Sequence, residues 1–222
     1  MVDSRARFHT DTTGGPHLLT QMTSLHEERL DRVCNTLRAT GARTVLDLGC
    51  GSGSLLSLLV REPRFTQLVG LDQSGISLSL ARTILATTLE KGTPEVTLIN
   101  GSYQEPDLRL TGFDAAAMVE TIEHVPPHAL STVEQTVFGH YRPGSLFMTT
   151  PNSEYNPLLG LAPGEFREED HKFEWTRAKF RQWARGVATR NGYRVKFGGI
   201  GEEDPELGPP TQTALFTLSE RQ

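Results

Sequence analysis

The sequence predicts an α/β fold with one doubly wound, mostly parallel sheet, and three observations support this prediction. Short apolar runs of strand length alternate with amphipathic stretches of helix length from residue 44 onward. Three glycines, at positions 49, 51 and 53, directly follow the first apolar run, as expected where a strand turns sharply into a helix. The 222 residues, 36% of them hydrophobic, are enough to bury one α/β core.

The predicted strands are apolar runs bounded by polar or turn residues. They cover residues 44–48, 67–71, 96–100, 113–119, 146–150, 194–197 and 212–218. The predicted helices between and around them cover residues 25–40, 54–60, 75–90, 129–140 and 177–190. Seven strands with right-handed crossovers would form one sheet, with ligands at the carboxyl ends of its strands. We therefore expect a single domain over residues 1–222, with a loosely ordered segment over 1–24 and an irregular loop over 151–175.

Composition excludes several classes of protein. The net charge of −5 argues against a protein that coats long stretches of nucleic acid. Residues 167–196 nevertheless hold nine Lys or Arg against four acidic residues, which would suit a small basic patch beside an active site. The two cysteines, Cys34 and Cys50, fit a reducing compartment. Because no apolar run approaches twenty residues, we expect a cytoplasmic protein without a membrane partner.

The glycine loop is the first candidate for a binding site. Asp47 lies two residues before Gly49, and Asp72 ends the next predicted strand, where a carboxylate could accept hydrogen bonds from two ribose hydroxyls. A dinucleotide dehydrogenase would use the same two features. However, the order D-x-G-x-G-x-G places an acid upstream of the loop, where it would repel a diphosphate. A zwitterionic nucleoside without phosphate fits this loop better.

The segment Glu120-Thr121-Ile122-Glu123-His124 follows a predicted strand directly and is the second candidate site. If it winds helically, Glu120, Glu123 and His124 share one face and converge. Two carboxylates that close repel each other, so a divalent cation, an arginine or a shared proton must relieve the repulsion. The alternative is a helix start with acidic residues near the positive end of the helix dipole.

Residues 44–114 resemble the cofactor site of Rossmann-like class I methyltransferases, which bind S-adenosylmethionine. This resemblance implies that Asp47, Gly49 and Gly51 lie along the methionine part of the cofactor. It also implies that Asp72 holds the ribose and that Ser102 lies near the adenine. In such folds the methyl acceptor sits beyond the fourth strand, which is where the E-x-x-E-H segment lies.

Three segments belong together: E-T-I-E-H over residues 120–124, T-P-N-S-E-Y-N-P over 150–157 and D-H-K-F-E-W-T over 170–176. In combination they resemble one family, the small-RNA 3′-terminal ribose 2′-O-methyltransferases. The resemblance implies that one divalent cation lies beside the cofactor, held by Glu120, Glu123, His124 and His171, and that residues 151–175 form a loop for metal and substrate. Two carboxylates and two imidazoles favour Mn²⁺, with Mg²⁺ possible.

The expected activity is metal-dependent methyl transfer to the 2′-hydroxyl of the 3′-terminal nucleotide of RNA. Only that nucleotide offers free 2′ and 3′ hydroxyls as neighbouring ligands, so a chelating cation would recognise the RNA end. The expected partners are an RNA 3′ end and a protein of RNA repair or small-RNA processing. The chain would be a stand-alone enzyme or the methyltransferase domain of a longer protein.

Two other functions remain open on the sequence alone. One is a small-molecule O-methyltransferase resembling the ubiquinone-biosynthesis enzymes, which also carry E-x-x-E-H-V-P after the fourth strand. The other is a non-catalytic scaffold that binds the cofactor. Within the loop, Asn152 and Asn156 are either nucleotide contacts or turn formers. Thr176 is expected to cap the helix that follows, with Phe180 and Trp183 in the core.

Overall fold

The structure is a computed structural model that describes residues 16–88 and 94–219, the first eight of them by backbone only. One seven-stranded sheet runs through it in the order β3-β2-β1-β4-β5-β7-β6. All neighbouring strands from β3 to β5 pair in parallel, and β7 pairs antiparallel with both β5 and β6. The strands are β1 Thr44–Leu48, β2 Gln67–Asp72, β3 Glu95–Asn100, β4 Ala115–Val119, β5 Ser145–Pro151, β6 Tyr193–Ile200 and β7 Thr211–Leu218. The predicted Rossmann-like, mostly parallel sheet is confirmed.

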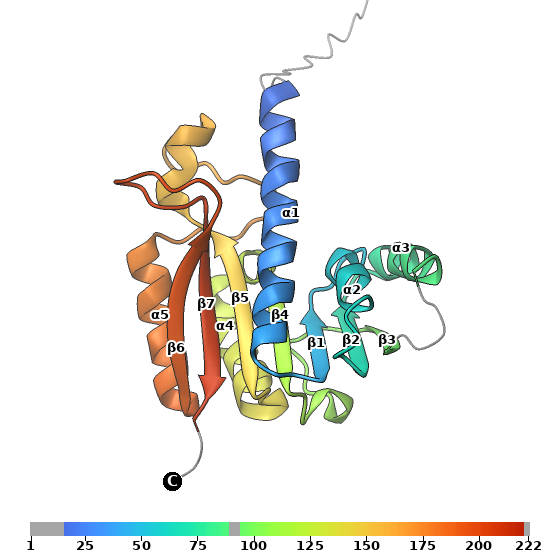
Figure 1. Ribbon diagram of the computed structural model, residues 1–222. Helices are drawn as coiled ribbons and strands as arrows, with labels where there is room; N and C mark the ends of the chain where they lie inside the picture. The colour runs from blue at the N-terminus through green and yellow to red at the C-terminus, as the bar shows by residue number, and fades with distance from the viewer. Residues whose placement is uncertain (1–15, 89–93, 220–222) are drawn as a thin grey trace, which may run out of the picture.

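Helices cover both faces of this sheet (Figure 1). They are α1 Pro16–Ala39, α2 Ser54–Leu59, α3 Gly75–Ala86, α4 Leu130–Val133 and α5 Arg177–Asn191. One hydrophobic core packs α5 and the segment around α4 against β4, β5 and β7, with Phe138, Phe180 and Phe216 at its centre. The second core packs α1, α2 and α3 against the other face, through residues such as Leu37, Leu56 and Phe147. Both faces are therefore apolar, as a doubly wound sheet requires.

The N-terminal prediction needs a correction. We expected a loosely ordered segment over 1–24 and a helix from residue 25, but α1 begins at Pro16. Proline has its φ fixed at a helical value and lacks the amide hydrogen that the first turn leaves unpaired, so it is well suited to the first helical position. Residues 1–15 lie outside the described part of the chain.

The prediction of one regular helix over residues 129–140 is also wrong. A 3₁₀ turn leads into the short α4, which continues as a π-helix from Glu134 to Tyr141. The hydroxyls of Thr136 and Tyr141 donate to the carbonyl oxygens of Gln104 and Glu105, at 3.2 and 2.6 Å. In a π-helix, hydrogen bonds join residues five apart, which brings these two side chains toward the same side. The wide helix thereby holds the chain segment that follows β3.

The other differences are small. The fourth strand begins at Ala115, two residues later than predicted, and β6 extends over Tyr193–Ile200. The last residues of the helix predicted over 75–90 lie outside the described part of the chain, and α3 ends at Ala86. As predicted, the side chain of Thr176 caps α5 by accepting from the amide of Lys179, at 3.3 Å. Across the described residues, none of the helices has the length and apolar character needed to cross a membrane.

Candidate active site

The glycine loop after β1 has the backbone that the sequence predicted. Gly49 and Gly51 have φ angles of +84° and +53°, which L side chains rarely adopt. A Cβ atom on Gly49 would lie 2.4 Å from Oγ1 of Thr121, so only glycine fits between the loop and the end of β4. A Cβ atom on Gly51 would meet nothing within 4 Å. The loop thus packs against the β4 segment at one glycine and leaves open space at the other.

Asp72, at the end of β2, fixes this loop. One of its oxygens accepts from the amide of Gly51 and the other from the amide of Ser74, both at 2.8 Å. Asp47 lies below the loop and is only 2% exposed, and its Oδ2 atom has no hydrogen-bond partner among the described residues. Burial, together with the charge of Asp72, raises the pKa of Asp47 to about 7. A buried carboxylate without a donor fits a cationic group bound above it.

A cavity of about 400 Å³ opens above these residues. Gly49, Gly51, Asp72 and Ser102 line it, whereas Asp47 is not among its lining residues. That these residues bind the cofactor stays a prediction. The same cavity reaches the other candidate site, because its wall also includes a set from the segment after β4 and from the loop before α5. That set is Glu120, Thr121, His124 and Asp170. Residues of both candidate sites therefore line one cavity, although Glu123 and His171 are not among its lining residues.

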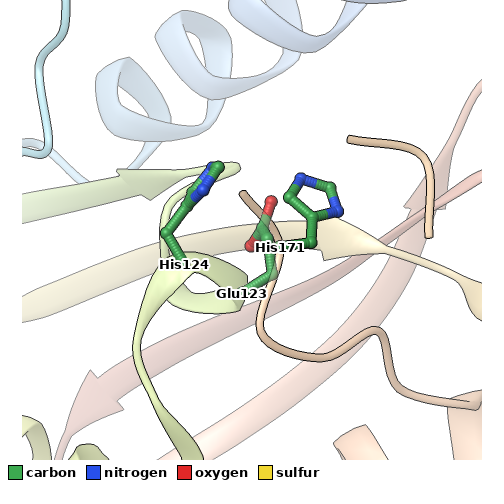
Figure 2. Close-up of side chains that lie close together, drawn as sticks. All are labelled: Glu123, His124 and His171. Carbon is green, nitrogen blue, oxygen red and sulfur yellow. The ribbon is translucent and has the colours of Figure 1, made fainter. Parts of the chain in front are cut away.

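Three of the four predicted metal ligands come together. Glu123, His124 and His171 each offer a ligand atom, and these atoms all lie within 4.8 Å of one another (Figure 2). Glu123 and His124 belong to a 3₁₀ turn that follows β4, and His171 comes from a segment 47 residues later. The backbone joins the two segments, since the amide of Lys172 donates to the carbonyl of Glu123 at 2.8 Å. We refer to these three side chains as the Glu-His-His cluster.

Glu123 is the buried member of the cluster. It is 0% exposed, and its Oε2 accepts from the hydroxyl of Thr150 at 2.9 Å. Its Oε1 has no partner among the residues that the structure describes. Burial and then the nearby charge of Glu120 raise the pKa of Glu123 well above its ordinary value. The ionised form of Glu123 is therefore poorly stabilised by the protein alone. A divalent cation beside Oε1 would stabilise it.

Glu120 lines the same cavity as His124, but it is not one of the three side chains that come together. Glu120 has a φ of +46° and does not begin a helix, so it does not share a face with Glu123 and His124. Its carboxylate instead lies 3.4 Å from the guanidinium of Arg29 on α1 and accepts from Thr149 Oγ1 at 2.7 Å. An arginine thus relieves the repulsion at this carboxylate, which is one of the alternatives that the sequence left open. The role of Glu120 as a metal ligand stays a prediction.

Each histidine of the cluster has a carboxylate at its Nδ1 atom. His171 Nδ1 lies 2.7 Å from Oε1 of Glu174, and His124 Nδ1 lies 3.1 Å from Oδ2 of Asp170. The Glu174 side chain is 0% exposed, whereas that of Asp170 is 73% exposed. A metal-ligating histidine commonly binds a carboxylate through its other ring nitrogen. Both imidazoles therefore have the arrangement of metal ligands that bind through Nε2.

The charges around the cluster also fit a divalent cation. Four carboxylates lie around it, those of Glu120, Glu123, Asp170 and Glu174. Among the described residues, only the guanidiniums of Arg29 and Arg167 lie between them. The carboxylates thus outnumber the guanidiniums, and a divalent cation would offset this imbalance. The ligand set contains oxygen and imidazole nitrogen and no thiolate, which suits Mn²⁺ or Mg²⁺.

The two asparagines of the T-P-N-S-E-Y-N-P segment are buried structural residues. Asn152 is 0% exposed, and its amide donates to the carbonyls of Leu207 and Pro209. Asn156 is bonded to Arg167 and Glu174. Their amides therefore support the fold around the cluster, which favours the structural interpretation over a nucleotide contact. Phe180 lies in the core, as predicted, and Trp183 packs against that core while partly exposed.

Several residues around the site could not be found from the sequence. Arg29 is 91 positions from Glu120, and neither residue belongs to a motif that links them. Arg167 lies in a run of charged residues that gives no sign of burial, yet its side chain is only 8% exposed. Thr149 and Thr150 could have been suspected, because they lie near the end of β5, the neighbour of β4, and Glu120 directly follows β4.

Comparisons with known proteins agree with this geometry. A family model described as "Methyltransferase domain" matches residues 45–144. The crystal structure of the methyltransferase domain of bacterial CtHen1-C is 40% identical and has a TM-score of 0.79. That match covers 88% of this chain and 99% of the other. The fold and the glycine-loop cavity thus define an S-adenosylmethionine-dependent methyltransferase of class I.

Curated relatives narrow this class. The small RNA 2′-O-methyltransferase of Mus musculus is 37% identical over 205 residues, which are 87% of this chain and 51% of that protein. The Arabidopsis thaliana protein of the same name is 35% identical over 210 residues, 86% of this chain and 22% of that protein. The chain belongs to the small RNA 2′-O-methyltransferase family and matches its methyltransferase domain. It spans about half of the mouse relative and about a fifth of the plant one.

Proposed function

We propose that this protein transfers a methyl group from S-adenosylmethionine to the 2′-hydroxyl of the 3′-terminal nucleotide of RNA, in a reaction that requires one divalent cation. Mn²⁺ is favoured over Mg²⁺ because two of the ligands are imidazoles. One observation carries this proposal. A single cavity is lined both by the glycine loop with Asp72 and by His124 of the Glu-His-His cluster.

The residues of the chain have separate roles in this proposal. Asp72 and the glycine loop would hold the cofactor, and the open space at Gly51 leaves room for it. Glu123, His124 and His171 would hold the cation. A cation there would lower the pKa of a hydroxyl that it contacts and fix the direction of its lone pairs. The buried wall around Glu123 and Thr150 would exclude water on the side away from the cavity.

Family membership favours an RNA acceptor over the small molecules of a ubiquinone-biosynthesis-like enzyme. The curated relatives above are small RNA 2′-O-methyltransferases. The cytoplasmic location and a partner from RNA repair or small-RNA processing stay predictions.

The test is methyl transfer from labelled S-adenosylmethionine to three matched oligonucleotides. They end in a 3′-terminal ribose, a 3′-terminal 2′-deoxyribose and a 3′-phosphate, and each is tried with Mn²⁺ and with EDTA. The proposal predicts label only on the free ribose end and only with metal. Equal labelling of the deoxyribose end, or labelling in EDTA, would contradict it. A catechol in place of the oligonucleotide tests the small-molecule alternative.

A further inference from the structure

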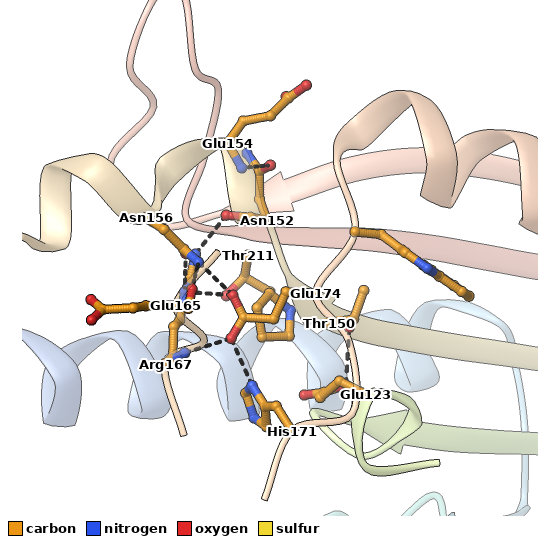
Figure 3. A network of polar contacts seen from close by, with 12 residues as sticks. Glu123, Thr150, Asn152, Glu154, Asn156, Glu165, Arg167, His171, Glu174 and Thr211 are labelled. Carbon is orange, nitrogen blue, oxygen red and sulfur yellow. Dashed lines mark hydrogen bonds and ion pairs between the residues drawn. The ribbon is translucent and has the colours of Figure 1, made fainter. Parts of the chain in front are cut away.

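A chain of hydrogen bonds leads from Arg167 through Asn156 and Glu174 to His171 (Figure 3). Arg167 determines which partner is the donor in each bond. A guanidinium only donates hydrogen bonds. Its Nε donates to Oδ1 of Asn156 at 2.8 Å, and its NH2 group donates to the carbonyl of Asn152 at 2.7 Å. The amide oxygen of Asn156 must therefore face Arg167, since the reverse orientation would bring two donors together.

The orientation of Asn156 determines the next bond. With its oxygen toward Arg167, its Nδ2 donates to Oε2 of Glu174 at 2.6 Å. The other oxygen of Glu174, Oε1, accepts from the amide of Arg167 at 2.7 Å. Both oxygens of Glu174 thus accept from N–H donors, and Nε of Arg167 lies 4.0 Å from Oε2. A carboxylate in these contacts only accepts hydrogen bonds.

The last bond of the chain assigns the proton on His171. Because Glu174 can only accept, the Nδ1 atom of His171, 2.7 Å from Oε1, must be the donor. A neutral imidazole carries one proton, so a proton on Nδ1 leaves Nε2 with a free lone pair. The ring of His171 is buried and lies 4.9 Å from that of His124, at an interplanar angle of 78°.

We infer that Glu174 is a positioning residue that holds His171 in the Nδ1–H form and directs Nε2 toward the metal, with Asn156 and Arg167 orienting Glu174 in turn. The inference rests on the proposed function, because it assigns a purpose to a site for a cation. It also connects the T-P-N-S-E-Y-N-P segment to the site, since the asparagine at position 156 acts through Glu174 on the cluster.

The second histidine provides an internal comparison. His124 has the same arrangement with Asp170, but that carboxylate is 73% exposed. Water can replace an exposed carboxylate at Nδ1, whereas nothing can replace the buried Glu174. We therefore expect Glu174→Gln to weaken metal binding much more than Asp170→Asn.

The first experiment needs no variant beyond one used for signal assignment. Long-range ¹H–¹⁵N correlation spectra of the metal-free protein at mildly alkaline pH report which ring nitrogen of each histidine carries the proton. The His171→Gln variant assigns the signals by the set that disappears. The inference predicts the Nδ1–H form for His171. The Nε2–H form would overturn it.

The second experiment measures Mn²⁺ affinity, from the electron paramagnetic resonance signal of free Mn²⁺ during titration. Glu174→Gln should bind Mn²⁺ about 10- to 100-fold more weakly, because the amide must turn a donor toward Asn156 or toward His171. Glu154→Gln is the matched control: Glu154 lies in the same loop as Glu174, but it pairs with Arg177 at the start of α5 and not with the cluster. It should bind Mn²⁺ like the wild type. The metal-free melting temperature and the cofactor affinity of each variant show that it is folded.

The outcomes separate the inference from the proposed function. A wild-type protein that binds Mn²⁺, together with a folded Glu174→Gln variant of equal affinity, contradicts the inference alone. A wild-type protein that binds neither Mn²⁺ nor Mg²⁺ contradicts the proposed function. If Glu174→Gln does not fold, the His171 tautomer in the wild type still decides the inference.

Discussion

The two halves of the cavity are built in different ways. The cofactor half uses backbone turns at the ends of β1 and β2, tied together by Asp72 over 21 positions of sequence. The part around the Glu-His-His cluster, which we call the metal half after the ligand proposed for it, uses side chains from α1, from the turn after β4, from the end of β5 and from the segment before α5. The halves meet closely where Gly49 packs against Thr121.

The two halves are therefore sensitive to different substitutions. The cofactor half depends on φ angles and amide directions, which a few glycines and one carboxylate provide. The metal half depends on linked hydrogen bonds in which each donor has one acceptor. If one acceptor is replaced by a donor, the neighbouring bonds and the side chains of the cluster must reorient. We therefore expect substitutions in one half to leave ligand binding in the other half intact.

The largest effect is expected from Glu123→Gln. The substitution keeps the size of the side chain and removes the charge at the unpaired oxygen. A bound cation is worth several kcal/mol of transition-state stabilisation, so methyl transfer should fall by about 1000-fold or more. Mn²⁺ binding should be lost and S-adenosylmethionine binding retained, both measured by titration calorimetry. A variant with wild-type activity in Mn²⁺ would contradict the assignment of the cluster.

A large effect on stability is expected from Gly49→Ala, at the junction of the halves. The new Cβ atom would overlap Thr121 Oγ1 and would also force an L residue to a positive φ. Together these should lower the free energy of unfolding by about 3 kcal/mol, measured by urea denaturation. Gly51→Ala is the matched control, because its Cβ atom meets nothing in the protein within 4 Å. It should cost only about 1 kcal/mol but weaken cofactor binding.

Asp72→Asn should affect only the cofactor half. Both oxygens of Asp72 accept from backbone amides, so an asparagine must turn its own donor toward one of them. Cofactor affinity should fall by about 10- to 100-fold, since hydrogen bonds to charged groups contribute about 1.5–3 kcal/mol. Mn²⁺ affinity, measured in the absence of cofactor, should stay at the wild-type value. A parallel loss of both would show that the halves are coupled.

The smallest effect is a pH dependence through Asp47. Its folded pKa of about 7 lies above the unfolded value of about 3.9, so the folded state binds a proton that the unfolded state releases. The ligand-free protein should lose stability as pH rises between these values. A cationic ligand favours the ionised form and lowers this pKa, so cofactor affinity should rise with pH and level off above about 7.

The measurement is cofactor affinity at several pH values for the wild type and for Asp47→Asn. Between about pH 6 and 8 the wild type should gain less than about tenfold in affinity relative to the variant. The stability difference between the two proteins, from thermal unfolding without ligands, should change in the opposite direction. A pH profile identical in both proteins would show that Asp47 does not respond to the cofactor.

The sequence was sufficient for the fold and for most of the cofactor half. Alternating strand and helix patterns, the spacing of Gly49 and Gly51, and an acid at the end of β2 are local signals. They predict where these residues meet, because parallel strands bring their carboxyl ends to one edge of the sheet. The exceptions, the start of α1 and the π-helix, depend on a single proline and on tertiary contacts of Thr136 and Tyr141.

The metal half could be predicted only in part. Glu123 and His124 were candidates from the E-x-x-E-H segment itself, whereas His171 was found only because three motifs together resemble one family. The spacing of Glu120, Glu123 and His124 did not predict how they are arranged. The position of Glu120 is set by its positive φ and by Arg29 on α1. The support by Asn156, Arg167 and Glu174 depends on burial and hydrogen-bond direction, and neither is visible in the order of residues.

The central claim is that cofactor and metal occupy one cavity side by side. The most direct measurement is the NMR relaxation of the cofactor's ¹³C-labelled methyl group, bound to the protein, with and without Mn²⁺. Paramagnetic Mn²⁺ broadens only signals of nearby nuclei. We predict strong broadening in the wild type and none in Glu123→Gln. If Mn²⁺ binds to the wild type and leaves the methyl signal unchanged, the metal lies elsewhere and the claim is wrong.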